Sequence, residues 1–427
     1  MTDLGATIRA EFPLFSKDID GHPIVYLDTA ATAQKPRTVI DAMTTFYEQE
    51  NANVKRGMHV LAERSTEAFE AARTRVQKFL HAKTAREIIF TKNCTESINL
   101  VARSWGEKNL RKGDVVLLSL LEHHSNIVPW LQLKEKIGIG VEWIGIEDDG
   151  MLKMDDAKKI FKQGKVKFLS LTCVSNVLGI KTPTTELTKL AHAHGALVLL
   201  DAAQLAPHAP IDVQALDCDF LAFSGHKVYG PTGIGVLYGK EKFLEAMPPF
   251  LGGGTMIQEV FTDRFTPSHL PEKFEAGTPP IAEAVGLHAA IDFLEGIGWE
   301  KIQKYEQTLL AYALKKLSEI DELIILGPKD PECIASCISF ICTTGTPTSY
   351  KLQATSSIHP HDLTEYCGRK GVCLRAGHHC AQPLHHSLGH PATTRMSFGI
   401  YTTKEEIDQT CTIIREAIEF FTASNLA

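Results

Sequence analysis

Short apolar runs alternate with segments of helical periodicity through the N-terminal and central parts of the chain. The apolar runs occupy residues 115–119, 141–146, 166–171, 196–200 and 220–223. Between two of them, Leu187, Leu190, Ala191 and His194 have the spacing of one helix face, and Gly195 ends that helix. Strands that alternate with helices predict a mostly parallel sheet covered on both faces, here an α/β domain at residues 20–285.

The pattern changes after the Gly- and Pro-rich stretch at 276–280. A helical pattern from about 281 to 320 precedes shorter apolar runs at 323–326, 338–341 and 395–400, and the segment 404–421 is helical again. This predicts a smaller α+β domain at 286–427, against which residues 1–19 are expected to pack. Residues 343–358, rich in Thr, Ser, Gly and Pro, predict a surface loop.

Composition narrows the class of protein. The 427 residues carry a formal net charge of −7 and show no basic stripe, so nucleic acid and anionic membranes are not expected partners. The N-terminus lacks an apolar signal core and no long apolar run follows, which predicts a cytoplasmic protein. Most of the ten cysteines are therefore expected to be reduced and buried.

The run that begins at Ala196 ends on Asp201, and Lys227 follows in Ser224-Gly-His-Lys. Open α/β sheets bind ligands at the carboxyl ends of their strands. A lysine that forms an imine with pyridoxal phosphate (PLP), and an acid that keeps a proton on the pyridine nitrogen, are what this cofactor needs. The sequence therefore predicts a PLP site with Lys227 and Asp201 at its centre.

Other polar residues follow the same strand ends. Residues 91–99 predict a turn that opens a helix, where Thr95 and free N–H groups suit a phosphate, although an ordinary N-cap is the alternative. Ser224 and His226 are expected to reach this anion from the lysine side. Gln204 follows Asp201 by one turn, near the expected position of the phenolic oxygen of the ring.

Two more strand ends carry candidate groups. An imidazole after a strand end, as at His123 or His124, is able to stack on a planar cofactor ring and to move a proton. His124 is interpreted as structural, and the role of His123 follows from the resemblance given below. The amide of Asn176 is placed to bond a cofactor hydroxyl or a substrate carboxylate.

Cys380 lies in Arg375-Ala-Gly-His-His-Cys, where neighbouring imidazoles can hold a thiolate at neutral pH. Arg395, in an apolar run, is expected to fork onto a carboxylate, either that of a substrate or one of the protein's own. The histidines around Cys380 leave a His/Cys metal-binding scaffold as an alternative. Because adjacent histidines point to opposite sides, no metal ligands are predicted.

Together these motifs resemble the group II cysteine desulfurases, in particular the SufS type of the Suf iron–sulfur assembly system. The resemblance covers nearly the whole chain, and Ser224-Gly-His-Lys with Arg375-Ala-Gly-His-His-Cys is its most specific part. Shorter matches lie at 26–31, 122–126, 174–179 and 274–279. It implies a fold-type I PLP enzyme that is a homodimer, with a mostly parallel seven-stranded sheet in its large domain.

The resemblance also implies a reaction. L-Cysteine is converted to L-alanine, and its sulfur becomes a persulfide on Cys380 that a SufE- or SufU-like acceptor collects for iron–sulfur cluster assembly. L-Selenocysteine is the alternative substrate of the same scaffold. By this resemblance, Lys227 forms the Schiff base, Cys380 is the nucleophile, and His123 stacks on the cofactor ring and transfers a proton. Asp201 bonds the ring nitrogen and Gln204 the ring oxygen, while the phosphate is bound by Thr95, Ser224 and His226, and by Thr278 from the partner subunit. The substrate carboxylate is bound by Asn176 and Arg395, with Arg375 nearby.

Three features depart from the family pattern. Lys55 stands where members often carry His, Cys94 precedes Thr95, and the loop before His359 is longer than usual. The segment 359–362 is either part of an acceptor docking surface or a helix start capped by Asp362.

Overall fold

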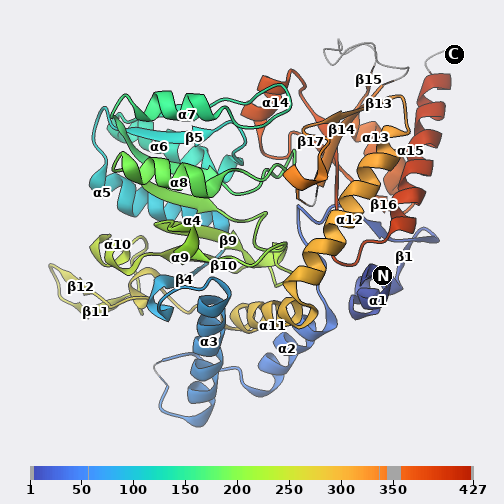
Figure 1. Ribbon diagram of the computed structural model, residues 1–427. Coiled ribbons are helices and arrows are strands. Elements are labelled where there is room, and N and C mark those ends of the chain that lie inside the picture. Colours follow the sequence, from blue (N-terminus) through green and yellow to red (C-terminus); the bar gives the residue numbers. More distant parts are fainter. Residues whose placement is uncertain (1–3, 56, 336, 344–356, 425–427) are drawn as a thin grey trace.

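A seven-stranded sheet forms the centre of the larger lobe in the computed structural model, which describes residues 4–55, 57–335, 337–343 and 357–424 (Figure 1). The strand order is β4-β10-β9-β8-β7-β5-β6. Only β10 runs antiparallel to its neighbours. The strands are β4 (Ile88–Thr91), β5 (Val115–Ser119), β6 (Gly140–Ile144), β7 (Val166–Thr172), β8 (Leu197–Asp201), β9 (Phe220–Ser224) and β10 (Gly235–Gly239).

The strands predicted from the apolar runs of the large domain are confirmed. β5, β8 and β9 are buried almost throughout, which is why their runs are continuously apolar rather than alternating. The runs at β6 and β7 are interrupted by Glu142 and Lys167, which are half-buried and exposed. The sequence did not single out β4 and β10, the pair at one edge of the sheet.

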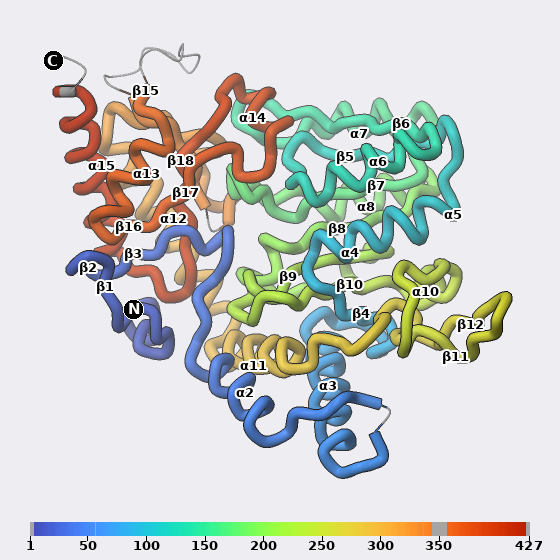
Figure 2. The backbone as a smooth tube through the Cα atoms, turned by 180° about the vertical axis from the view of Figure 1, so that it is seen from behind, coloured from blue at the N-terminus to red at the C-terminus, as the bar shows by residue number. Residues whose placement is uncertain are grey.

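Helices cover both faces of this sheet. Residues of α7 and α8 pack on one face, and those of α4 and α6 on the other (Figures 1 and 2). A π-helical segment at Val101–Gly106 continues α4 into α5. The helices of this lobe are α2 (Arg37–Gln49), α3 (Val60–Phe79), α4 (Cys94–Leu100), α5 (Glu107–Asn109), α6 (Val128–Ile137), α7 (Met154–Phe161), α8 (Thr184–Ala193), α9 (Val213–Leu216), α10 (Glu241–Ala246) and α11 (Ile281–Ile297).

The predicted helix from 281 to 320 is two helices, because Gly298 interrupts it with a φ of 93°. α11 packs against α2 and α3, whereas α12 (Trp299–Ser318) runs on to the smaller lobe. A periodic apolar pattern continued across the break, so the sequence did not reveal it. A hairpin of β11 (Ile257–Val260) and β12 (Phe265–Pro267) projects from the larger lobe.

The smaller lobe is an antiparallel sheet with helices. Its strands are β13 (Leu323–Leu326), β14 (Cys337–Thr343), β18 (Thr393–Ser397) and β17 (Arg375–Gly377), in that order, with β15 (Ser357–Ile358) beside β14. Its helices are α12, α13 (Pro360–Gly368), α14 (Gln382–Leu388) and α15 (Lys404–Ser424). The predicted loop at 343–358 falls mostly outside the described residues, and its ends belong to β14 and β15.

The N-terminal segment contacts this lobe. It contains α1 (Leu4–Ile8) and the short strands β1 (Asp18–Ile19), β2 (His22–Pro23) and β3 (Val25–Tyr26), of which β3 pairs with β16 (Val372–Cys373). Arg9 bonds the carbonyl oxygen of Tyr401 at 3.1 Å and pairs with Glu406 at 2.8 Å. In the described parts of the chain, no helix is long and apolar enough to cross a bilayer.

Candidate active site

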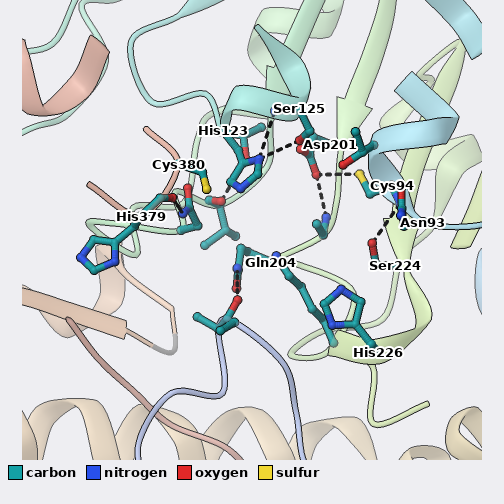
Figure 3. Close-up of a pocket in the computed structure, with 18 of the residues that line it drawn as sticks. Asn93, Cys94, His123, Ser125, Asp201, Gln204, Ser224, His226, His379 and Cys380 are labelled. Carbon is teal, nitrogen blue, oxygen red and sulfur yellow. Dashed lines mark hydrogen bonds between the residues drawn. The ribbon is translucent and has the colours of Figure 1, made fainter. Parts of the chain in front are cut away.

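A cavity of about 210 Å³ lies at the carboxyl ends of β7, β8 and β9, where the loop that follows β17 also arrives. Polar side chains from both lobes surround it (Figure 3). All but one of the residues predicted for the site line this cavity: Thr95, His123, Asn176, Asp201, Gln204, Ser224, His226, Lys227, Arg375, Cys380 and Arg395. The exception is Thr278, which is exposed and lines a separate cavity of about 320 Å³ with Leu251.

Lys227 ends the short 3₁₀ turn that follows β9. Burial lowers the pKa of its amine, while the nearby Asp201 carboxylate acts in the opposite direction. The amine therefore loses its proton more readily than an exposed lysine does, which suits a nucleophile or a base.

Asp201 is the last residue of β8 and is buried. Its Oδ1 accepts hydrogen bonds from the backbone N–H of Ala203 at 2.9 Å and from the thiol of Cys94 at 3.3 Å. Burial raises the pKa of this carboxyl, and Lys227 opposes the shift. The contact from Cys94 was not anticipated, because the sequence placed this thiol beside the phosphate rather than beside the acid.

His123 follows β5, and its Nδ1 lies 2.8 Å from the hydroxyl of Ser125 (Figure 3). Burial, reinforced by the positive charge of Lys227, lowers the pKa of His123 to about 3, so the ring is neutral at physiological pH. Gln204 donates a hydrogen bond to the carbonyl oxygen of Ala30 at 2.8 Å.

The residues predicted to bind the phosphate from within the same chain all line the cavity. The hydroxyl oxygen of Ser224 accepts a hydrogen bond from the backbone N–H of Cys94 at 2.9 Å, which joins the end of β9 to the start of α4. His226 contacts the hydroxyl of Thr32 at 3.2 Å, and burial lowers its pKa to about 4.

The loop that carries Cys380 has an unusual backbone. Gly377, His379 and Cys380 have φ values of 117°, 49° and 57°. The thiol of Cys380 and the ring of His123 lie near one another, while the ring of His379 points away from the thiol (Figure 3). His379 instead contacts Thr393 at 3.0 Å, and burial lowers its pKa to about 2, so it brings no positive charge to the thiol.

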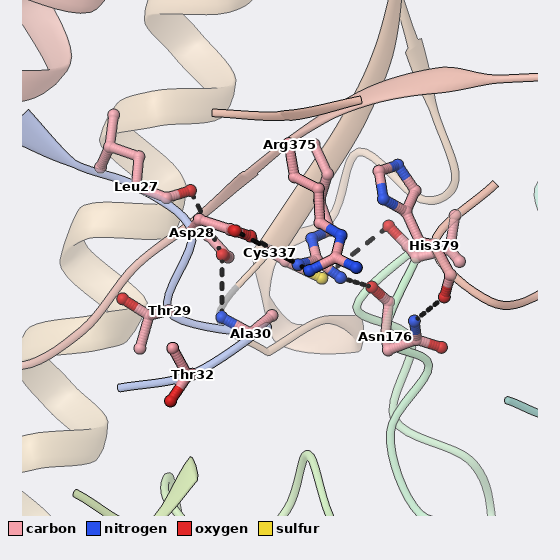
Figure 4. Close-up of polar contacts among 12 residues, drawn as sticks. Leu27, Asp28, Thr29, Ala30, Thr32, Asn176, Cys337, Arg375 and His379 are labelled. Carbon is pink, nitrogen blue, oxygen red and sulfur yellow. Dashed lines mark hydrogen bonds and ion pairs between the residues drawn. The ribbon is translucent and has the colours of Figure 1, made fainter. Parts of the chain in front are cut away.

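Arg395 makes the contact with an internal carboxylate that the sequence left open. One guanidinium nitrogen donates to Asp28 at 2.8 Å and another to the carbonyl oxygen of Asn176, also at 2.8 Å (Figure 4). Arg375 lies 3.9 Å from the same carboxylate. The buried Nε of Arg395 has no hydrogen-bond partner among the described residues, which leaves a donor for an incoming anion. Asp28 lies within the quoted Tyr26–Ala31 match, but the sequence suggested no role for it.

The structure gives the surroundings of one departure from the family pattern, Lys55, and of the segment 359–362. Lys55 pairs with Glu70 at 3.0 Å and also contacts Glu272. The segment at 359–362 does start a helix, but His359 caps it, through a 3.3 Å bond from the N–H of His361, and not Asp362. The described ranges contain no group of three or more His, Cys, Asp or Glu side chains arranged to hold a metal ion.

Comparison with known families decides the classification. The model of the aminotransferase class-V family matches residues 25–410. The chain belongs to this family. Probable cysteine desulfurases from Synechocystis sp. and Streptomyces coelicolor are 45% and 46% identical to it over 98% and 97% of its length, covering 96% and 97% of theirs.

Solved structures of class-V relatives have the same fold. The apo cysteine desulfurase from Thermococcus onnurineus superimposes with a TM-score of 0.88 at 37% identity, covering 97% of this chain and 98% of the relative. The cysteine desulfurase CsdA from Escherichia coli gives 0.86 at 37% identity, with the same coverage. The predicted fold-type I architecture and the resemblance to cysteine desulfurases are confirmed.

Class-V relatives of this kind depend on PLP, which is therefore the cofactor of this chain. The cavity fits this group. It offers the partly buried amine of Lys227 and, on the buried Asp201, an Oδ2 that remains available, because the hydrogen bonds that described residues donate to this carboxylate go to Oδ1. The side chains of Thr95, Ser224 and His226, which carry hydroxyl and imidazole groups, also line this cavity.

Proposed function

We propose that this protein is a PLP-dependent cysteine desulfurase, which takes the sulfur of L-cysteine onto Cys380 as a persulfide and releases L-alanine. The observation that carries the proposal is the shared cavity: the amine of Lys227, the buried carboxyl of Asp201 and the thiol of Cys380 all line one space of about 210 Å³. The 45–46% identity to probable cysteine desulfurases supports the same activity.

In this proposal the chain's own residues bind and orient the substrate. The free Nε of Arg395, with Asn176 and Arg375 beside it, receives the substrate carboxylate. Asp28 holds the other end of the Arg395 guanidinium, so the free donor is fixed in direction. Asp201 and Gln204 orient the cofactor, and Thr95, Ser224 and His226 hold its phosphate.

The bound cofactor supplies an electron sink for the pair released at Cα. Lys227 takes the Cα proton, because burial favours its neutral amine. His123, neutral at physiological pH, exchanges a proton with the substrate thiol. The Cys380 thiolate forms a bond to the substrate sulfur as the Cβ–S bond breaks, and the electron pair of that bond stays on the carbon framework that becomes alanine.

The test is alanine formation from L-cysteine by the purified protein and two variants. Lys227→Ala is expected to lose turnover. Cys380→Ser is expected to keep the visible absorbance of the cofactor and to lose alanine formation from L-cysteine. Because selenolate leaves more easily than thiolate, the Cys380→Ser variant is expected to retain part of its activity with L-selenocysteine. Full desulfuration by either variant would contradict the assignment.

The biological setting of this reaction extends the proposal. The enzyme acts as a cytoplasmic homodimer, Thr278 reaches the phosphate in the partner subunit, and a SufE- or SufU-like acceptor collects the persulfide for iron–sulfur cluster assembly. The proposed role of Thr278 is supported by its position: it is exposed and lies outside the cavity that Lys227 lines. Alanine formation should therefore increase with acceptor concentration, because each unaccepted persulfide leaves Cys380 blocked.

A further inference from the structure

His124, one residue beyond His123, contacts the Cys380 loop on both sides of the thiol. Its backbone N–H donates to the carbonyl oxygen of Cys380 at 2.7 Å. Its ring Nε2 accepts the backbone N–H of Gln382 at 3.1 Å. The ring also packs against His378, with 5.5 Å between the centroids. A single residue of the β5–α6 connection therefore brackets the reactive part of the loop.

The loop needs such support because its backbone is strained. His379 and Cys380 lie consecutively in the left-handed region, which costs energy for residues other than glycine. Within the loop, the N–H groups of Cys380 and Ala381 bond His378 at 3.2 and 2.8 Å. From outside the loop, Asn176 bonds the carbonyl oxygen of His379 at 2.7 Å, and His124 makes the two bonds described above.

The hydrogen bond from Gln382 requires an unprotonated ring nitrogen on His124, and the surroundings of the ring favour that form. Burial, and the neighbouring His378, lower its pKa below the ordinary value. His123, whose ring centroid lies 6.3 Å away, is also neutral. A neutral imidazole keeps one nitrogen as an acceptor, and the N–H of Gln382 is placed to use it.

We propose that His124 is a positioning residue, which holds the thiol of Cys380 at the cavity within reach of the substrate sulfur. The inference rests on the proposed function, because only sulfur transfer needs the thiol at that point. It also joins the two halves of the site, since consecutive residues contact the cofactor side (His123) and the thiol loop (His124). The role differs from the purely structural one that the sequence suggested for this histidine.

Two substitutions and a control test it. His124→Leu removes the ring acceptor and keeps the backbone N–H, whereas His124→Gln can return an acceptor oxygen to the N–H of Gln382. His386→Leu removes an exposed histidine from neighbouring α14. The measurements are the rate of iodoacetamide alkylation of Cys380, followed by peptide mass spectrometry on protein with and without cofactor, and alanine formation from L-cysteine and L-selenocysteine.

For His124→Leu we expect faster alkylation, because the released loop exposes its thiol. Alanine formation from L-cysteine should fall roughly tenfold or more, since small misplacements of reacting groups have large effects on rate. The selenocysteine reaction, which needs no attack by Cys380, should fall much less. His124→Gln should recover most of both properties, and the control should match the parent.

Three results would overturn the positioning role: unchanged or slower alkylation in His124→Leu, equal losses with the two substrates, or a Gln variant no better than Leu. None of these would affect the proposed function. That function fails separately, if Cys380→Ser still forms alanine from L-cysteine at the parental rate.

Discussion

Glu122 shows how burial governs the charge of a single side chain beside the active site. It is fully buried, directly before His123, with Oε2 accepting the amide of Asn126 at 2.6 Å and Oε1 in contact with the hydroxyl of Ser119. Burial raises its pKa to about 8 despite these hydrogen bonds, so the carboxyl is protonated at neutral pH. Glu122 lies in the match at residues 122–126, but the sequence alone suggested no role for it.

Stability should therefore fall as pH rises. The folded-state pKa lies above the ordinary value of 4.5, so the folded protein binds more protons between pH 4.5 and about 8. In that window the free energy of unfolding decreases by up to about 1.4 kcal/mol per pH unit from this group. Glu122→Gln should remove that contribution, which makes the variant gain on the parent between pH 6 and pH 8.

Urea unfolding at pH 6, 7 and 8, at one fixed protein concentration, measures this difference. Glu48→Gln, an exposed position on α2, is the matched control and should follow the parent. Parallel pH profiles for Glu122→Gln and the parent would show that Glu122 is ionised in the folded state.

Cys94 makes a second contact of residue scale. Its thiol donates a hydrogen bond to the carboxylate of Asp201 at 3.3 Å. Cys94→Ala should lower alanine formation roughly two- to tenfold, the effect of losing one hydrogen bond of about 0.5–1.5 kcal/mol. Cys94→Ser keeps a donor and should stay nearer the parent. Cys333→Ala, at a half-exposed thiol in the smaller lobe, controls for loss of a thiol in general; equal rates in all three variants would remove this role.

Among the elements, β10 and the start of α4 approach each other closely because Gly235 has no side chain. A Cβ at Gly235 would lie 2.4 Å from the Cα of Asn93 and 2.5 Å from its carbonyl carbon. Both are backbone atoms, which cannot move aside cheaply. This close approach places Asn93 and Cys94 at the cavity, beside the end of β9.

Gly235→Ala should displace that helix start. We expect a loss of roughly 1–3 kcal/mol in stability from overpacking, and weaker retention of the cofactor, because Asn93 and Cys94 line its cavity. Urea unfolding and cofactor absorbance after dialysis measure the two effects. Gly296→Ala, on α11 with open space around it, should lower neither stability nor cofactor retention; full cofactor retention in Gly235→Ala would contradict the expected displacement.

In the molecule as a whole, exposed apolar side chains lie on the β11–β12 hairpin, and the segment that leads into the hairpin contacts the stretch before Thr278. The β11–β12 hairpin leaves Val260 63% and Phe265 52% exposed. The base of this segment bonds the stretch before Thr278, where the N–H of Gly277 donates to Gly254 at 2.9 Å. Apolar groups gathered on a projecting hairpin are typical of a protein–protein interface. This is the face that we assign to the proposed homodimer.

Phe265→Asp should therefore weaken the dimer and, since Thr278 would lose its partner's phosphate, weaken cofactor retention in parallel. Sedimentation velocity over a dilution series, combined with cofactor absorbance, measures both properties. Phe420→Asp, on α15 and also 52% exposed, is the control and should remain as the parent. If Phe265→Asp is a monomer and keeps its full cofactor, Thr278 does not contribute to cofactor binding in the partner subunit.

The apolar pattern alone predicts strands β5 to β9 of the sheet and the polar side chains that follow their carboxyl ends. β5, β8 and β9 are continuous apolar runs whose first polar residue marks the carboxyl end, as Asp201 does for β8. Parallel strands bring those ends to one edge, so residues far apart in the chain were predicted to meet there. The cavity does contain them, apart from Thr278, whose proposed role belongs to another subunit.

Only the tertiary structure decided the contacts that do not follow a strand end. The partner of Arg395 is Asp28, which lies hundreds of residues away on the N-terminal segment. Cys94 turned toward Asp201, and His124 toward the Cys380 loop, because the packing of α4 and of the two lobes fixes which side chains meet. Periodicity and motif spacing describe one element at a time. They carry no information on which element a side chain faces, and that is settled when the elements pack.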